Sequence, residues 1–209
     1  MQDTKLKMFE ALACGLLDNG ITRLFGLIGD ANLFMVESYR QQDGASFIPA
    51  VHEGSAVLMA HGSAQVTGEV GVATVTHGPA LTNCVTALTD AARAKVGMVL
   101  MAGDTPTTNP HHLQNTDQRD VAALCGAGFE QLRSPATANA DLARAIYRAK
   151  AEKRPILFNM PADFMWEEAG YEHVVHPVFN TPAYAPEGDG DFVTVKSTLI
   201  GVDVFKIEA

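Results

Sequence analysis

A glutamate stands where a short apolar run gives way to small residues. Residues 47–64 read FIPAVHEGSAVLMAHGSA, and Glu53 follows the apolar run 47–51 after a single histidine. The pattern predicts a strand, a tight loop and a helix that opens at Gly54-Ser55. In open α/β sheets, ligands bind in the crevice beyond the carboxyl ends of the strands. A carboxylate there is either stabilised by N–H groups at the helix start or kept protonated by an apolar pocket, and the second arrangement permits proton transfer.

Polar and glycine-rich loops follow the other apolar runs as well. Strands are expected at 22–28, 70–76, 97–102 and 155–160, because each run is apolar or rich in β-branched residues and ends at a turn signal. The short run 129–132 is a further strand candidate. The carboxyl ends of parallel strands meet at one edge of a sheet, so we expect the loops after them to converge on Glu53. The residues that open these loops are Ile28-Gly29-Asp30, Thr76-His77-Gly78-Pro79, Gly103-Asp104 and Met160-Pro161.

Helical patterns alternate with these strands along most of the chain. Helices are expected up to residue 19, over 32–41, from 54 to about 66, and over 81–94, 120–125 and 139–153. A βα unit repeated five or six times predicts a doubly wound α/β fold. We therefore expect a mostly parallel sheet of about six strands with helices on both faces. Asp117, Asp120 and the charges of 148–154 are expected to form solvated faces.

The regular alternation stops after Tyr171. Residues 172–191 are rich in Pro and Gly, which is typical of an extended linker, and 193–209 alternate weakly enough for one or two strands. The predicted division is a domain over 1–171 and a linker with a short C-terminal tail over 172–209. The polar loop 103–118 is longer than compact domains usually hold without a functional reason.

Composition excludes several classes of function. The 209 residues carry a net charge of −9 without any basic run, which argues against a nucleic-acid partner. No run approaches the roughly 20 apolar residues of a membrane span. Cys14, Cys84 and Cys125 lie far apart in expected helices, where a buried thiol is the favoured interpretation. A soluble protein in the reducing cytoplasm is therefore expected.

Three common site motifs are incomplete. A zinc-protease H-E-x-x-H motif after His52-Glu53 would need histidine at position 56, which is alanine. The segment FGLIGDAN supplies only Gly26 and Gly29 of a dinucleotide-binding G-x-G-x-x-G, and no Walker-type phosphate loop exists. The adjacent His111-His112 have no carboxylate or cysteine at ligand spacing, so no metal ligand is expected in this chain.

The order of the motifs resembles one enzyme family. A strand followed by HEGSAVLMAHGSA, then THGPALTN, then GDTP and a loop with HHLQNTDQ is similar to the pyrimidine-binding N-terminal domain of thiamine-diphosphate-dependent enzymes. The subgroup it resembles contains acetolactate-synthase-like enzymes and 2-keto-acid decarboxylases. The resemblance covers about residues 5–163, and the combination of motifs is far more specific than any one of them.

The resemblance implies roles for individual residues. In the family, the glutamate at the position of Glu53 hydrogen-bonds N1′ of the cofactor's aminopyrimidine and activates the cofactor. An apolar crevice can raise the pKa of a glutamate by up to about 3–5 units, which would keep the proton that N1′ must share. Ala80 replaces a glycine of the family turn, and Ile28 replaces a proline. The implied cofactor contacts are Ile28, Gly29, Thr76, His77, Gly78, Pro79 and Asn83, and the implied substrate-side residues are His77, His111, His112 and Gln114, for which solvated loop side chains are the alternative.

The family binds the diphosphate through Mg²⁺ on another domain, whose signature is G-D-G followed by N-N. Residues 187–192 resemble the opening of that signature, but no N-N follows, so a turn is expected there. The expected cofactor is thiamine diphosphate, with Mg²⁺ held by a domain that this chain lacks. The expected partners are a second copy or a separate diphosphate-binding chain, with a 2-keto acid as substrate. The alternative is an inactive fragment or interaction module with the same fold.

Overall fold

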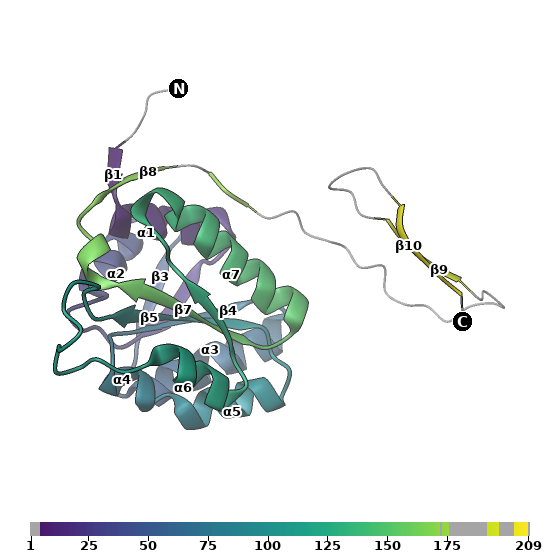
Figure 1. Ribbon diagram of the computed structural model, residues 1–209, viewed down its shortest axis with the longest axis horizontal. Coiled ribbons are helices and arrows are strands. Elements are labelled where there is room, and N and C mark those ends of the chain that lie inside the picture. The colour runs from purple at the N-terminus through teal and green to yellow at the C-terminus, as the bar shows by residue number, and fades with distance from the viewer. Residues whose placement is uncertain (1–4, 172, 176–191, 197–202, 209) are drawn as a thin grey trace. The chain divides into compact units, whose positions relative to one another are not determined.

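A six-stranded parallel sheet forms the centre of the fold. The computed structural model describes residues 5–171, 173–175, 192–196 and 203–208 (Figure 1). The strands lie in the order β3-β2-β4-β5-β7-β6, and every neighbouring pair is parallel. Their bounds are β2 Arg23–Gly26, β3 Ser46–Pro49, β4 Gly71–Val75, β5 Met98–Asp104, β6 Gly128–Gln131 and β7 Pro155–Pro161. The predicted doubly wound α/β fold is therefore confirmed.

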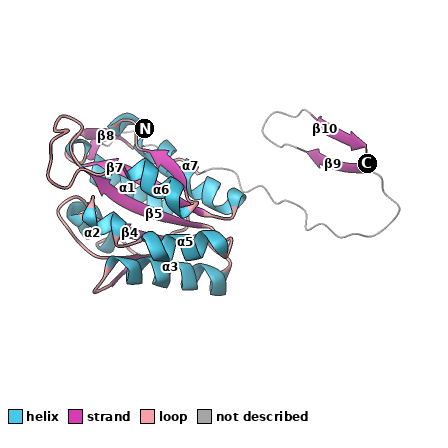
Figure 2. Ribbon diagram, turned by 60° about the horizontal axis from the view of Figure 1, so that its bottom comes forward, coloured by secondary structure: helices cyan, strands magenta, loops and turns pink. Residues whose placement is uncertain are grey.

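Helices cover both faces of this sheet (Figures 1 and 2). One face packs against α1 Met8–Asp18, α2 Leu33–Arg40 and α7 Ala138–Glu152. The other packs against α3 Glu53–Thr67, α5 Val85–Arg93 and α6 Gln118–Cys125. Each face has its own apolar core, and β4 and β7 are buried along their whole length. Burial on both faces explains why these strands read as continuous apolar runs rather than alternating ones.

Two segments depart from the expected boundaries near Glu53. The run 47–51 was expected to be a strand throughout, but β3 ends at Pro49 and the side chain of Val51 is 98% exposed. Helix α3 begins at Glu53 itself, one residue earlier than the small residues indicate. His52 makes this possible, because its Nδ1 accepts a hydrogen bond from the N–H of Gly54 at 3.1 Å and caps the helix.

The helix expected over 81–94 is split into two. The four-residue helix α4, Pro79–Thr82, is followed by a break at Asn83-Cys84, and α5 continues from Val85. Nothing in the local residue types is a helix breaker there. The break instead accompanies a hydrogen bond from the side chain of Asn83 to Glu53 of α3. The short helix α4 places its two ends near different loops of the sheet edge.

Smaller elements complete the described chain. Strand β1, Lys5–Lys7, pairs antiparallel with β8, Glu168–Gly170. Two 3₁₀ helices are present: η1, Pro135–Thr137, directly precedes α7, and η2, Ala162–Phe164, directly follows β7. The chain divides into a unit over 1–177 and one over 178–209. In the second unit, β9 Phe192–Lys196 pairs antiparallel with β10 Asp203–Glu208. Residues 187–191 of the G-D-G-like segment lie outside the described residues. None of the described helices is long and apolar enough to cross a membrane.

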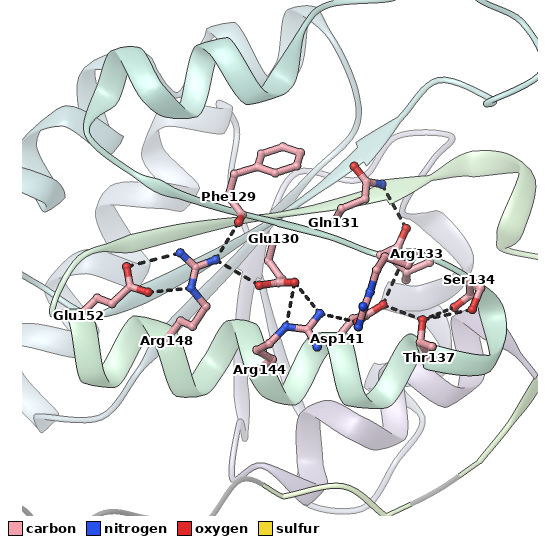
Figure 3. Close-up of polar contacts among 11 residues, drawn as sticks. Phe129, Glu130, Gln131, Arg133, Ser134, Thr137, Asp141, Arg144, Arg148 and Glu152 are labelled. Carbon is pink, nitrogen blue, oxygen red and sulfur yellow. Dashed lines mark hydrogen bonds and ion pairs between the residues drawn. The ribbon is translucent and has the colours of Figure 1, made fainter. Parts of the chain in front are cut away.

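An ion-pair network clamps the edge strand β6 to α7 (Figure 3). Glu130 of β6 accepts hydrogen bonds from Arg144 and Arg148 of α7. Arg148 also donates to the carbonyl of Phe129 at 2.7 Å, so this residue does not lie on the solvated face expected for 148–154. The carboxylate of Asp141 is fully buried and is bonded by Arg133, Arg144 and Thr137. The network therefore fixes the position of β6, which no strand covers on its outer side in the described sheet.

Candidate functional site

Glu53 and Asn83 meet at the carboxyl edge of the sheet. Glu53 is the first residue of α3 and is half-buried, while Asn83 caps the carboxyl end of α4. The side-chain amide of Asn83 donates a hydrogen bond to Oε2 of Glu53 at 3.0 Å. Two motifs that are thirty residues apart in the sequence are thereby joined. The bond holds one carboxylate oxygen and leaves Oε1 with its acceptor capacity.

The amino end of α4 contacts the long loop. Gly78 precedes the helix with φ +57° and ψ −111°, and a Cβ placed on it would lie 2.0 Å from the carbonyl oxygen of Gln114. Both the backbone conformation and the space therefore require glycine. Pro79 occupies the first helical position, where its fixed φ suits a helix start, and its side chain is exposed. Helix α4 thus spans from the loop of Gln114 to Glu53.

The loop after β2 packs against the loop after β4. A Cβ on Gly29 would lie 2.6 Å from the Cβ of Thr76, so glycine permits this close approach. The buried Asn32 holds the turn, since its Oδ1 accepts from the N–H of Gly29 at 2.7 Å and its amide donates to the carbonyl of Leu27 at 3.1 Å. Ile28, which directly precedes Gly29, is 45% exposed.

Two of the three predicted substrate-side histidines contact each other. The rings of His77 and His112 are in edge-to-face contact with centroids 5.4 Å apart. His77 is 3% exposed, and its Nδ1 has no hydrogen-bond partner in the described part of the chain. Its Nε2 lies 3.6 Å from Oδ1 of Asp30. His112 Nδ1 accepts from the N–H of Gln114 at 3.2 Å, whereas His111 is exposed.

Asp30 belongs to a loop that the sequence predicts at this edge, but the sequence assigns it no role. Its Oδ1 accepts a hydrogen bond from the hydroxyl of Thr76 at 2.8 Å. This bond, together with the neighbouring His77, holds the pKa of Asp30 below its ordinary value although partial burial acts in the opposite direction. A carboxylate directly after the first strand of the sheet was the available signal. The carboxylate of Asp30 lies beside the buried His77 and keeps a negative charge at this edge of the sheet.

The structure brings most of the predicted residues together at the ends of β2, β3 and β4. The pairs are Glu53 with Asn83, Gly29 with Thr76, His77 with His112, and Gly78 with Gln114. Ile28, Pro79 and His111 lie at the same loops with exposed side chains. Within the described residues, no group of three or more His, Cys, Asp or Glu side chains is placed to hold a metal ion.

Two thiols lie beneath this edge and are buried. Cys84 directly follows Asn83, and burial raises the pKa of its thiol to about 12, with the charge of Glu53 acting in the same direction. Burial also raises the pKa of Cys125. A thiol with a raised pKa is protonated at neutral pH and is a poor nucleophile. These two cysteines serve as small apolar residues of the core, as the sequence indicated.

Comparison with known proteins identifies similar chains. A family model described as "Thiamine pyrophosphate enzyme, N-terminal TPP binding domain" matches residues 6–124. Sulfoacetaldehyde acetyltransferase of Castellaniella defragrans is 31% identical over 159 residues, which are 75% of this chain and 26% of that protein. The large subunit of acetolactate synthase isozyme 3 from Escherichia coli (strain K12) is 35% identical over 99 residues, 47% of this chain and 17% of that protein. Indole-3-pyruvate decarboxylase of Azospirillum brasilense is 29% identical over 195 residues, 88% of this chain and 34% of that protein. The chain thus spans about a third or less of these curated relatives.

Proposed function

The chain belongs to the thiamine pyrophosphate enzymes, as their N-terminal TPP-binding domain, and from this premise we propose that Glu53 holds the aminopyrimidine of thiamine diphosphate. The reaction we propose is that of a carboligase or decarboxylase acting on a 2-keto acid. The names of the relatives support this class, since they include acetolactate synthase and indole-3-pyruvate decarboxylase. The observation that carries the proposal is the hydrogen bond from Asn83 to Glu53, which joins two of the family's motifs at one sheet edge.

The residues at this edge suit an aromatic nitrogen ring. Glu53 is half-buried, and with Oε2 held by Asn83 its Oε1 can share a proton with a ring nitrogen. Val51 lies two residues before Glu53 in the chain and is 98% exposed. An exposed apolar side chain at this position favours contact with an apolar group, which would exclude water from the site. Bound thiamine diphosphate supplies a carbon nucleophile for the carbonyl group of a 2-keto acid.

Other side chains would act on the substrate side of the same edge. The rings of His77 and His112 lie in contact, and we assign both to the substrate side of the cofactor. Oδ1 of Asp30 lies 3.6 Å from Nε2 of His77 and would orient the imidazole ring. Gln114, whose backbone packs on Gly78, would place its amide beside the bound 2-keto acid. These roles are those of proton donors and orienting groups rather than of nucleophiles.

The remaining cofactor contacts are proposed to come from another domain. Charge-assisted contacts to phosphate and metal are the strong ones, and we assign the diphosphate and Mg²⁺ to another domain. A separate diphosphate-binding chain could supply that domain, and we also propose that the domain described here forms a homodimer or larger oligomer. The competing proposal is a domain that binds a partner without turnover.

Calorimetric titration with thiamine diphosphate and Mg²⁺ tests the proposal. The full chain is titrated alone and together with a candidate chain that carries G-D-G…N-N, and turnover of pyruvate is followed in the pair. Glu53→Gln should abolish turnover and leave the urea unfolding midpoint nearly unchanged, because glutamine can still accept from Asn83. Gln65→Glu, at an exposed position on the same helix, is the control and should leave turnover unchanged. Equal turnover with glutamine at position 53 would exclude the assigned role, and binding of the partner without any turnover would favour the competing proposal.

A further inference from the structure

A polar pocket lies at the other half of the same sheet edge, beside the ends of β5, β7 and β6. It is open to solvent and has a volume of about 310 Å³. Its floor contains Gln118 and Asn159, which are 3% and 2% exposed. None of the predicted cofactor or substrate-side residues lines it. The remaining lining residues are Asp104, Asn115, Thr116, Asp117, Arg119, Phe129 and Gln131.

The amide N–H groups on the floor are engaged by the protein. Gln118 Nε2 donates to the carbonyl of Gly103 at 2.7 Å and to Oδ1 of Asn159 at 2.8 Å. Asn159 Nδ2 in turn donates to Oδ2 of Asp104 at 2.7 Å and to Oε1 of Gln131 at 3.1 Å. Each amide nitrogen has two hydrogens, so both are fully used. The floor therefore has no spare side-chain amide donor to offer a ligand.

Acceptors, by contrast, remain available there. Gln118 Oε1 is buried and has no hydrogen-bond partner among the described residues. If the oxygen and nitrogen of the Gln118 side-chain amide were exchanged, the oxygen would face two other oxygens, Gly103 O and Asn159 Oδ1. That orientation is disfavoured. A buried acceptor without a partner is costly, and native proteins normally satisfy it. A ligand that brings N–H or O–H donors would remove this cost.

The charge of the pocket has the sign that such a donor requires. Asp104 and Asp117 contribute two carboxylates against one guanidinium, that of Arg119. The guanidinium lies 4.2 Å from the centroid of the Phe129 ring, a cation–π contact that draws it to the pocket wall. Asp117 caps α6, and its bonds from the N–H groups of Arg119 and Asp120 both end on Oδ1, so Oδ2 keeps its acceptor capacity.

We propose that this pocket binds a small organic cation with N–H donors, of the primary ammonium class. The ammonium group would donate to Gln118 Oε1 and to the carboxylates of Asp104 and Asp117. The site goes beyond the proposed function and uses different residues. It also touches the same loop, because Asn115 and Thr116 directly follow Gln114, whose backbone packs on Gly78.

The test compares two cations of equal charge and similar size. The full chain, labelled with ¹⁵N, is titrated at pH 7 and low salt with n-butylammonium chloride and, separately, with tetramethylammonium chloride. Only the first carries N–H donors. We expect n-butylammonium to shift the backbone amide signals of residues 115–119 and the side-chain amide signals of Gln118 and Asn159. Tetramethylammonium should bind with an affinity that is lower by about tenfold or more, since it lacks the charge-assisted hydrogen bonds.

Matched variants separate the pocket from general charge effects. Asp117→Asn retains a good helix cap and removes one charge, so the affinity for n-butylammonium should fall about two- to fivefold. Asp120→Asn, on the same turn but outside the pocket, should leave it unchanged. Thr116→Lys should abolish binding by placing an ammonium group in the pocket, whereas Ala123→Lys should not. Equal affinity for both cations, equal effects of the paired variants, or no n-butylammonium shifts in the pocket would each overturn the proposal.

Discussion

Gly78 and Gln114 approach so closely that a single added carbon atom would not fit between them. A Cβ on Gly78 would lie 2.0 Å from the carbonyl oxygen of Gln114, and Gly78 has a positive φ of +57°. Through this contact, the loop after β5 packs on the turn before α4. Asn83, at the other end of α4, is hydrogen-bonded to Glu53. The position of the predicted substrate-side loop is therefore tied to the predicted cofactor turn through backbone atoms.

Gly78→Ala should destabilise the protein for two reasons. A side chain at this φ and ψ costs about 1–3 kcal/mol, and the clash with Gln114 adds a cost of similar size. We expect the free energy of unfolding to fall by about 2–4 kcal/mol in urea denaturation. Gly62→Ala is the control, because a Cβ there meets nothing within 4 Å and alanine suits the interior of α3. That control should stabilise by about 0.5–1 kcal/mol. Equal effects of both variants would contradict the packing.

The order of strands and helices could be read from the sequence, because parallel strands covered on both faces leave continuous apolar runs. The strand order in the sheet could not, since it depends on which helix packs on which face. The break between α4 and α5 was also missed. It depends on the distant contact of Asn83 with Glu53, and no local residue type signals it. His52 was read as part of a loop because histidine is not among the usual helix caps.

Residues of the candidate site could be predicted from the sequence where they belong to a motif, but not where they stand as single residues. Glu53, Gly78 and Asn83 stand in recognisable patterns. Asp30 and Gln118 lie within the predicted loops but were given no role there, because their importance depends on distant partners, Thr76 and Asn159. The ion-pair network between β6 and α7 could not be predicted for the same reason. Arg148 has the spacing of an exposed helical face, yet it lies over the edge strand and donates to Phe129.

Asn83→Ala should lower activity much more than stability. Asn83 is exposed, so the free energy of unfolding should change by less than about 0.5 kcal/mol. Its loss frees the carboxylate of Glu53 to rotate, and turnover of pyruvate by the assembled enzyme should fall roughly tenfold. Thr82→Ala is the control, because the Thr82 hydroxyl bonds only within α4, to the carbonyl of Pro79. If Thr82→Ala reduced turnover as strongly, orientation of Glu53 by Asn83 would not be the cause.

The two adjacent histidines should behave differently. His112→Ala removes the edge-to-face contact with His77, so the ring signals of His77 should shift in NMR spectra, with about 1 kcal/mol of stability lost. His111→Ala removes an exposed side chain and should change stability by less than about 0.5 kcal/mol. His77 signals that respond equally to both variants, or to neither, would contradict the contact.

Asp141 should make the stability of the fold depend on pH in a defined direction. Burial acts to raise the pKa of Asp141, but hydrogen bonds from Arg133, Thr137 and Arg144 outweigh it and lower the pKa below its ordinary value of 3.8 (Figure 3). A carboxylate with a lowered folded-state pKa stabilises the fold above its unfolded-state pKa, and this stabilisation is lost as the pH falls through the folded-state pKa.

Asp141→Asn tests this dependence. The variant should lose about 2–4 kcal/mol of unfolding free energy at pH 7, because the buried partner of Arg133 and Arg144 becomes neutral. The difference from wild type should stay constant down to about pH 4 and shrink below it, as the wild-type carboxyl takes up a proton. Urea denaturation at pH 7, 5, 4 and 3 measures this. Asp43→Asn, at an exposed turn, should change little at any of these pH values. A difference between wild type and Asp141→Asn that persists undiminished at pH 3 would show that the network stabilises by shape rather than by charge.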